Sequence, residues 1–321
     1  MNNFKKVGLT ALASSLVAVS AYAGEVTVAG SASMKVRHVD GGAANSGKAF
    51  SMGNQLTFSG AGELDNGLNV SISFVIDQGD DTVVSSGPFD SHSITISSED
   101  MGSLTLAGEG ANSATTAIDT TAAGDLWDNF DQLANSSGIT FPDLVSASGG
   151  RNNNLFYKSP DFSGFQVTAS YEPQGSTASS ASSFGVNYTG VEGLTLNYAV
   201  TDEETGTAST SGDNTVLKAS YAYGPVTVTY SSMEHDEALS TGANDIDMTS
   251  YAISYTVTDE LSLTYGSETS EKGSTGNTDA EIDGITVAYT AGGMTITGKM
   301  VDGENLDYST SSAADVEYWS L

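Results

Sequence analysis

Hydrophobic and polar residues alternate along most of the chain with a period of two. In residues 26–37 the even-numbered positions are apolar or small, and the odd-numbered positions are mostly polar and end in Lys35 and Arg37. Helical periodicity is nearly absent after the first residues. An alternation of this kind predicts β-strands with one apolar face and one polar face.

Short polar turns separate pairs of these stretches. Gly, Pro, Asn and Asp stand where tight turns between antiparallel strands require them. The turns lie at residues 64–67, 98–102, 159–164, 190–193, 223–225, 258–260 and 291–293. These seven hairpins account for fourteen strands, and the segments at the two ends add one strand each, so the pattern predicts sixteen strands.

The remaining connections are longer and polar, and they alternate strictly with the short turns. They lie at about 39–49, 77–91, 111–150, 172–181, 202–213, 232–245, 268–280 and 302–313. A soluble propeller or sandwich would also alternate apolar and polar residues, but not long and short connections in strict succession. Long loops at one end and short turns at the other are typical of bacterial outer-membrane barrels. A sheet that spans hydrocarbon must close on itself, and sixteen strands leave a water-filled lumen. We therefore expect an all-β, transmembrane antiparallel β-barrel of 16 strands, with long external loops and short periplasmic turns.

Tyrosines support a membrane location. Nine of them fall in phase with the apolar face of their stretches, mostly near the ends: Tyr157, Tyr171, Tyr188, Tyr198, Tyr221, Tyr230, Tyr255, Tyr265 and Tyr289. Tyrosine is common in strands in general, so a single one carries no weight. Nine tyrosines on the apolar face of their stretches are more informative. The boundary between lipid and water favours tyrosine, because the ring is apolar and its hydroxyl is polar.

The first 23 residues read as a secretory signal peptide. Lys5 and Lys6 form a positive region, residues 7–19 form an apolar one, and Ala21-Tyr22-Ala23 resembles a cleavage site. The apolar run is shorter than the roughly 20 residues that a spanning helix needs. We expect the signal at residues 1–23, the barrel at 24–321, and a location in the outer membrane.

Composition excludes several functions. Removal of Lys5 and Lys6 leaves eight basic residues against 40 acidic ones and changes the net charge from −30 to −32, so nucleic acid is not an expected partner. The chain has no cysteine and only three histidines. We therefore expect no enzyme, no cofactor and no metal centre. Acidic loop clusters such as 202–204 could bind Ca²⁺ weakly, but none has the spacing of a defined calcium loop.

The longest connection, residues 111–150, is too long to be an idle loop. It contains Trp127, Phe130 and Phe141, which suggests that it packs against another part of the protein. It also contains five acids: Asp119, Asp125, Asp128, Asp131 and Asp143. Two interpretations remain open on these residues alone. The loop folds into the lumen and narrows it, or it forms an external lid or a contact between subunits.

Basic residues alternate with the apolar face, so they are predicted to point into the lumen. They are Lys35, Arg37, Lys158, Lys218 and Lys299. A cation that faces lipid costs about 2–4 kcal/mol at mid-depth, so an inward position needs no function to explain it. The sharper hypothesis is that some of these cations oppose the acidic loop and create a transverse field that orients dipolar solutes. The net charge predicts negative mouths and weak cation selectivity.

Several stretches resemble the Gram-negative porin family, in particular its proteobacterial general-diffusion group. The resemblance rests on the signal ending Ala21-Tyr22-Ala23, on the opening Val26-Thr27-Val28-Ala29-Gly30, and on residues 153–165, NNLFYKSPDFSGF. The layout of the whole mature chain is similar as well. The resemblance implies a homotrimer of barrels, each with its third loop (111–150) folded inward. Its expected partners are outer-membrane lipid, lipopolysaccharide and small hydrophilic solutes.

The chain departs from the family pattern in two places. Phe156 occupies a position that is usually basic in these porins, which weakens the cationic half of the expected field. The family also ends in a long strand with a terminal aromatic residue, whereas this sequence stops at Leu321 and would place Glu317 on the lipid side. Either the last strand is unusually short or the chain continues beyond Leu321, and we expect the latter.

Three functions follow as hypotheses. The leading one is a passive porin for small hydrophilic solutes and ions. The alternative is a non-conducting outer-membrane barrel that acts as a surface receptor or adhesin. An outer-membrane hydrolase is the weakest, because few histidines could serve as its base.

Overall fold

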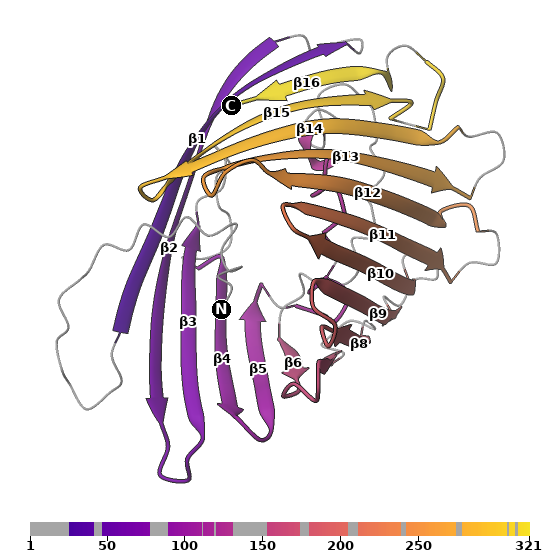
Figure 1. The fold of residues 1–321 in the computed structure, drawn as a ribbon. Coiled ribbons are helices and arrows are strands. Elements are labelled where there is room, and N and C mark those ends of the chain that lie inside the picture. The colour runs from indigo at the N-terminus through magenta and orange to yellow at the C-terminus, as the bar shows by residue number, and fades with distance from the viewer. Residues whose placement is uncertain are drawn as a thin grey trace.

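The protein, in a computed structural model, is a closed antiparallel β-barrel (Figure 1). The structure describes residues 26–41, 47–77, 89–110, 112–118, 120–130, 153–173, 180–204, 211–238, 242–273, 278–306, 308–311 and 314–321. The predicted signal peptide, residues 1–23, lies outside this set. Within the described residues, no helix has the length and apolar character that crossing a membrane requires.

Sixteen strands form the barrel, as the alternation predicted, and each pairs with its neighbours in sequence until β16 closes on β1. They are β1 (Val26–Gly41), β2 (Gly47–Glu63), β3 (Asn69–Asp77), β4 (Ser91–Ser98), β5 (Gly102–Glu109), β6 (Asn154–Lys158), β7 (Phe165–Glu172), β8 (Ser180–Tyr188), β9 (Leu194–Glu204), β10 (Gly212–Tyr223), β11 (Val226–Glu237), β12 (Ile246–Thr256), β13 (Leu261–Lys272), β14 (Ala280–Ala291), β15 (Met294–Glu304) and β16 (Val316–Ser320). All seven predicted hairpins are present.

The two faces of each strand differ as the period of two requires. On β10, Val216 is buried and faces inward, whereas Leu217 and Tyr221 are exposed on the outside. The nine tyrosines of the predicted set all fall on the outward positions of their strands. The outer surface is therefore apolar with tyrosines, and the inner surface is made largely of small polar residues.

Some strands run further toward the long loops than predicted. β11 continues to Glu237 and β13 to Lys272, so the predicted loops 232–245 and 268–280 both begin inside strands. β1 likewise reaches Gly41 and β2 begins at Gly47, within the predicted loop 39–49. The reason is that a hydrogen-bonded ladder needs only backbone partners, so it can continue where the outer side chains turn from apolar to acidic.

Acidic side chains encircle most of the outer surface at its loop end, and we call this set the acidic belt. Its members are exposed and outward-facing on β1 and on β9–β16: Asp40, Asp202, Asp213, Glu234, Asp236, Asp247, Glu271, Glu281, Asp283, Asp302, Glu304 and Glu317. The prediction that Glu317 faces the lipid side is correct, because Val316 and Tyr318 are buried and face inward.

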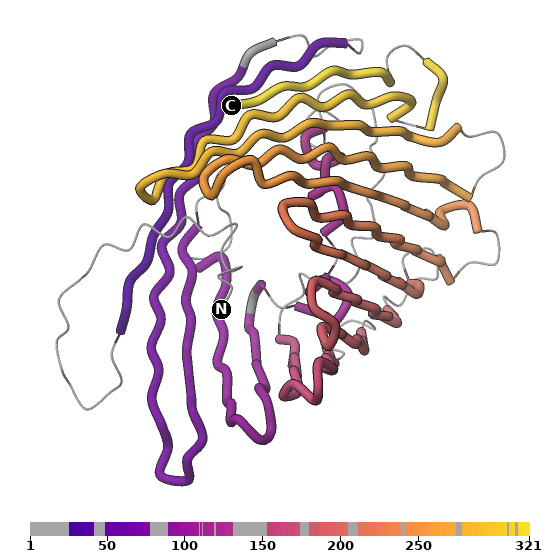
Figure 2. The backbone as a smooth tube through the Cα atoms, in the orientation of Figure 1, coloured from indigo at the N-terminus to yellow at the C-terminus, as the bar shows by residue number. Residues whose placement is uncertain are grey.

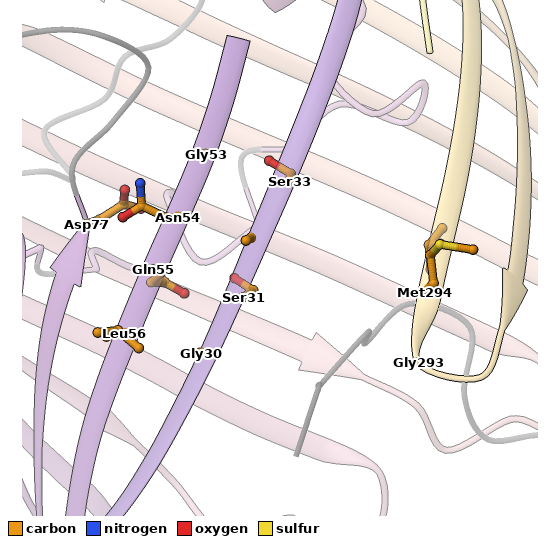
Figure 3. A pocket seen from close by; sticks show the side chains of 12 residues that line it. Gly30, Ser31, Ser33, Gly53, Asn54, Gln55, Leu56, Asp77, Gly293 and Met294 are labelled. Atoms are coloured by element: carbon orange, nitrogen blue, oxygen red, sulfur yellow. The ribbon is translucent and has the colours of Figure 1, made fainter. Parts of the chain in front are cut away.

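The closure between β16 and β1 is short. The ladder pairs Arg37–Gly41 with Val316–Ser320, and Val36 and Leu321 exchange two backbone hydrogen bonds of 2.8 and 2.9 Å. Beside the rest of β1, a cavity of about 1050 Å³ lies between Gly30–Ser33, Gly53–Leu56 and the turn at Gly293 (Figure 3).

Candidate functional site

Residues 112–118 and 120–130, which follow β5, run along the inside of the barrel, and we call them the inner loop (Figures 1 and 2). Its hydrogen bonds reach successive strands in order. Ala114 N–H donates to Ser183 of β8, Thr115 pairs with Thr201 of β9, Ala122 N–H donates to Ser231 of β11, and Ala123 N–H donates to Ser250 of β12, at 2.7–3.0 Å. Before them, Asn154 of β6 donates to the carbonyl of Asn112 at 2.8 Å. Small hydroxyl side chains thus fasten the loop to one half of the wall.

Glu268 of β13 is the strongest attachment of the inner loop. Its carboxylate is 1% exposed and accepts hydrogen bonds from the Thr121 hydroxyl at 2.5 Å and from Leu126 N–H and Trp127 N–H at 2.9 Å each. A buried carboxylate needs such donors, because it has lost its hydration. Hydrogen bonds from the loop, two of them from its backbone N–H groups, therefore replace the hydration that the Glu268 carboxylate has lost.

The loop folds back on itself next to this attachment. The Asp125 carboxylate accepts the Thr121 N–H, and the Thr121 hydroxyl accepts the Asp125 N–H, both at 2.8 Å. Asp125 has a φ of 54°, a left-handed conformation that Asp tolerates better than most residues. Gly124 beside it has a φ of 81°. This tight turn directs the next two N–H groups at Glu268.

Apolar packing holds the end of the described segment. Leu126 and Phe130 are buried in a cluster with Val39, Ile282, Val301, Leu306, Val316 and Tyr318, which come from β1, β14, β15, β16 and the last loop. The rings of Phe130 and Tyr318 meet edge to face at 6.3 Å. Gly266 and Gly284 make room for the loop, since an added Cβ would lie 2.5 Å from Ala123 Cβ and 2.9 Å from Leu126 Cδ2 respectively.

The five predicted loop acids do not form one group in the described residues. Asp125 caps the turn, and Asp128 is exposed on the following helical turn. Asp119, Asp131 and Asp143 lie outside the described residues. No group of three acidic or histidine side chains in the described ranges is arranged to hold a metal ion.

The five predicted basic residues all stand on inward positions, and three of them lie together. Ser320 of β16 pairs with Arg37 on one side and with Lys299 on the other, and Lys35 is the next inward residue on β1. We call Lys35, Arg37 and Lys299 the cationic strip. Two of them precede a residue of the cluster that packs on Phe130, since Val39 is the next inward residue after Arg37 and Val301 is the next after Lys299.

Lys218 and Lys158 lie elsewhere. Lys218 donates from Nζ to the carbonyl of Thr120, so it belongs to the inner loop's attachment. Lys158 is exposed near the short turns, beside Glu99 and Ser159.

The inner faces of β2–β5 form the part of the wall opposite these attachments, and we call it the hydroxyl wall. Between Glu63 at one end and Asp77 at the other, its described inward side chains are uncharged. The hydroxyl-bearing ones are Ser51, Thr57, Ser59, Ser71, Ser73, Ser91, Ser93, Thr95, Ser97, Ser103 and Thr105. Thr95 and Thr105 hydrogen-bond to each other at 2.8 Å. The described side chains along this wall therefore offer hydrogen-bond donors and acceptors and no charge between Glu63 and Asp77.

The last loop also turns inward at the mouth. Leu306 is fully buried, and Tyr308 is buried with its hydroxyl 3.0 Å from Ser270 Oγ. Burial raises the pKa of Tyr308 to about 12. The ring also lies under Lys272, with Nζ 5.6 Å from the ring centroid. This contact narrows the external end on the side of β13.

Glu268 was missed by the sequence reasoning, which placed it at the start of a loop. A signal for it exists, because Thr264, Gly266 and Glu268 continue the inward period of β13. The signal is weak, since the following residues are polar on both faces.

Comparisons with known proteins agree with this arrangement. A family model described as Gram-negative porin matches residues 8–304. Salmonella typhi OmpF, solved in complex with daunomycin, is similar with 13% identity and a TM-score of 0.69 over 95% of this chain and 98% of that one. A mutant of the Rh. blastica porin is similar with 15% identity and a TM-score of 0.64 over 92% and 97%. These identities show a shared fold. No curated protein sequence gives a significant match.

Proposed function

The chain belongs to the Gram-negative porin family and forms an outer-membrane diffusion channel, and we propose that it is a passive channel narrowed by its inner loop. The observation that supports this proposal is the series of contacts that residues 112–118 and 120–130 make with inward side chains from β6 to β16. The rest of the predicted 111–150 segment lies outside the described residues. Permeating solutes are small and hydrophilic, and the proposal needs no catalytic group or cofactor.

The proposed passage runs between the inner loop and the hydroxyl wall. Ser and Thr hydroxyls both donate and accept, so they can replace part of a solute's hydration. The cationic strip and the acids Asp125 and Asp128 border the same lumen, and they support a transverse field on the side of β15 and β1. The described side chains of the hydroxyl wall between Glu63 and Asp77 carry no charge, and together with Phe156 on β6 they confine that field to this side.

Weak cation selectivity is part of the proposal. The chain carries 40 acidic residues, and many of the described ones surround the loop end of the barrel. The negative potential there enriches cations at the mouth. The cationic strip opposes this enrichment deeper in the lumen, so we expect a small preference.

The proposed assembly is a homotrimer, supported by the outer face of β1–β5. Tyrosines mark the outward positions of β6–β14, but the described outward positions of β1–β5 carry none, and most of them are aliphatic residues, Phe, Met or Gly. Met34 and Phe50 are each 72% exposed there. A face without interfacial tyrosines suits a second subunit better than a lipid boundary. Lipid and lipopolysaccharide are the proposed partners of the remaining outer surface.

Current recordings test the proposal. Refolded protein is added to a planar bilayer under a salt gradient, and the expected result is stepwise openings in threes with a small reversal potential toward the cation side. A clear reversal potential toward the anion side would remove the selectivity claim. A silent membrane, despite a heat-modifiable folded barrel on gels, would favour the non-conducting receptor or adhesin instead.

A further inference from the structure

The last loop, whose described residues are 305–306, 308–311 and 314–315, carries two buried side chains although it lies at the external mouth. Leu306 is fully buried, and Tyr308 is 8% exposed. Gly303 of β15 makes room for Leu306, since an added Cβ would lie 2.9 Å from each of the two Leu306 Cδ atoms. A loop that buries its large side chains in this way is attached to the barrel wall.

The last loop lies directly above the inner loop on strand β13. Glu268 holds the inner loop, and the next two inward residues of the strand contact Tyr308 of the last loop. Ser270 meets the Tyr308 hydroxyl, and Lys272 lies over the Tyr308 ring. Consecutive inward positions of one strand therefore carry the two loops, with the inner loop deeper in the barrel and the last loop nearer the mouth.

The same order is found on β14 and β15. Gly284 of β14 lies against Leu126 of the inner loop, with an added Cβ 2.9 Å from Leu126 Cδ2. Gly303 of β15 is one inward position nearer the mouth and lies against Leu306. Leu306 also belongs to the buried cluster that contains Leu126 and Phe130. The packing around the end of the inner loop therefore includes a side chain of the last loop.

The backbone of the last loop is strained. Tyr308 has a φ of 52°, a left-handed conformation that is unfavourable for a bulky residue, and Asn305 has a φ of 54°. Such conformations persist only where surrounding contacts hold them, and they are common in segments that switch. The N–H groups of Leu306 and Asn305 close the loop on itself by donating to the Ala314 carbonyl at 3.0 Å and to the Asp315 carboxylate at 3.1 Å. The attachments of Leu306 and Tyr308 to the wall therefore maintain a strained backbone.

We propose that the last loop is a strap that positions the inner loop, so that release of the last loop from the wall also releases the end of the inner loop. Leu306 and Tyr308 are positioning residues, because they act on the passage through the inner loop and not by contact with a solute. An event at the cell surface that withdraws the last loop then changes the current from outside the lumen. This effect on the current rests on the proposed function, whereas the coupling between the two loops does not require conduction.

A single cysteine tests the coupling in the whole barrel. The chain has no cysteine and two tryptophans, so Leu306→Cys in a Trp319→Phe background provides one thiol in the last loop and one reporter, Trp127, in the inner loop. The refolded protein is treated with trimethylammonioethyl methanethiosulfonate, whose cationic adduct cannot return to an apolar cluster. We expect quenching of Trp127 by acrylamide to rise about twofold or more, because the ring packs against that cluster and is only partly exposed before release.

Reversal and matched variants separate coupling from damage to the fold. Dithiothreitol removes the adduct and should restore the original quenching. Thr310→Cys in the same background places the same adduct on an exposed residue of the last loop and should leave Trp127 unchanged. Leu306→Met keeps an apolar side chain of similar volume and should retain the quenching of the parent. Heat-modifiable gel mobility verifies that each variant is folded.

Three results would overturn the inference. A thiol at position 306 that does not react would show that the last loop is not released from the wall of the folded barrel. Complete reaction without a change at Trp127 would show that the inner loop holds its position alone. Equal changes in Leu306→Cys and Thr310→Cys would assign the effect to the adduct and not to the strap. Fluorescence needs no current, so a barrel that is silent in a bilayer would remove the proposed function and leave this test valid.

Discussion

At the scale of single residues, the position of the inner loop depends on a carboxylate that is almost completely buried. Glu268 accepts three hydrogen bonds, and two of them come from the consecutive N–H groups of Leu126 and Trp127. An unpaired buried donor costs more than a hydrogen bond contributes. Removal of one acceptor at this position therefore affects the loop before it affects the barrel, because the ladder of β13 does not involve the side chain.

Glu268→Gln is the sharpest test of this attachment. The amide has one acceptor oxygen and places an NH₂ group where the carboxylate accepted, so one backbone N–H of the loop loses its partner at a cost of about 1–3 kcal/mol. We expect faster amide exchange at Leu126 and Trp127 and increased noise in the open-channel current.

The matched control is Glu281→Gln, which removes an exposed belt carboxylate on the neighbouring strand β14. It should leave both the exchange and the current unchanged. Unchanged amide exchange in Glu268→Gln would show that the apolar cluster around Phe130 is sufficient to hold the loop.

At the scale of elements, the inner loop is bound by many small contacts to successive strands rather than by one large interface. Hydroxyls on β8, β9, β11 and β12 each satisfy a group of the loop, and glycines on β13 and β14 allow it to approach closely. The size of the wall side chains that contact the loop therefore sets the distance between the loop and the wall. Adding one methyl group at such a glycine should move the loop toward the passage.

Gly266→Ala tests that distance. Its new Cβ would lie 2.5 Å from Ala123 Cβ and 3.0 Å from Ala123 Cα, so the loop must shift. Overpacking of this kind costs about 1–3 kcal/mol. We expect a lower single-channel conductance, because the shift is toward the hydroxyl wall.

Gly298→Ala provides the control, since it introduces alanine into β15 at a position with nothing within 4 Å of the new Cβ. Its conductance should equal that of the parent. An unchanged conductance in Gly266→Ala would mean that the narrowest point lies away from this part of the loop.

At the scale of the whole molecule, the outer surface is divided into sectors. The sector over β6–β14 carries tyrosines, β9–β16 and β1 carry the acidic belt, and β1–β5 carry neither tyrosines nor, apart from Asp40, belt residues. Only the third sector lacks the interfacial residues that a lipid boundary favours. It is the sector that we assign to contacts between subunits.

Substitution of Met34 and Met52 tests that assignment. They face each other directly on β1 and β2, and they are 72% and 60% exposed. We expect Met34→Asn with Met52→Asn to lower the trimer fraction in unheated gels and in light scattering, because the amides would be buried without partners at the interface.

Val228→Asn with Ile253→Asn places the same amides on directly opposed residues of the tyrosine sector. This pair should leave the trimer fraction unchanged. If the two pairs have equal effects, the β1–β5 sector is not the subunit contact.

The sequence by itself determined the number of strands, the seven hairpins and the orientation of the wall residues. Successive side chains of a strand point to opposite faces of the sheet, so each side chain can point only inward or outward. Because hydrocarbon surrounds the barrel, the apolar face of each strand must point outward. Tertiary structure alone decided where the inner loop binds and that Lys35, Arg37 and Lys299 lie together, because these contacts join residues far apart in sequence. It also decided that Glu268 belongs to a strand. Above the hydrocarbon, side-chain polarity no longer distinguishes the two faces, and only the backbone ladder, continued from strand to strand, defines where a strand ends.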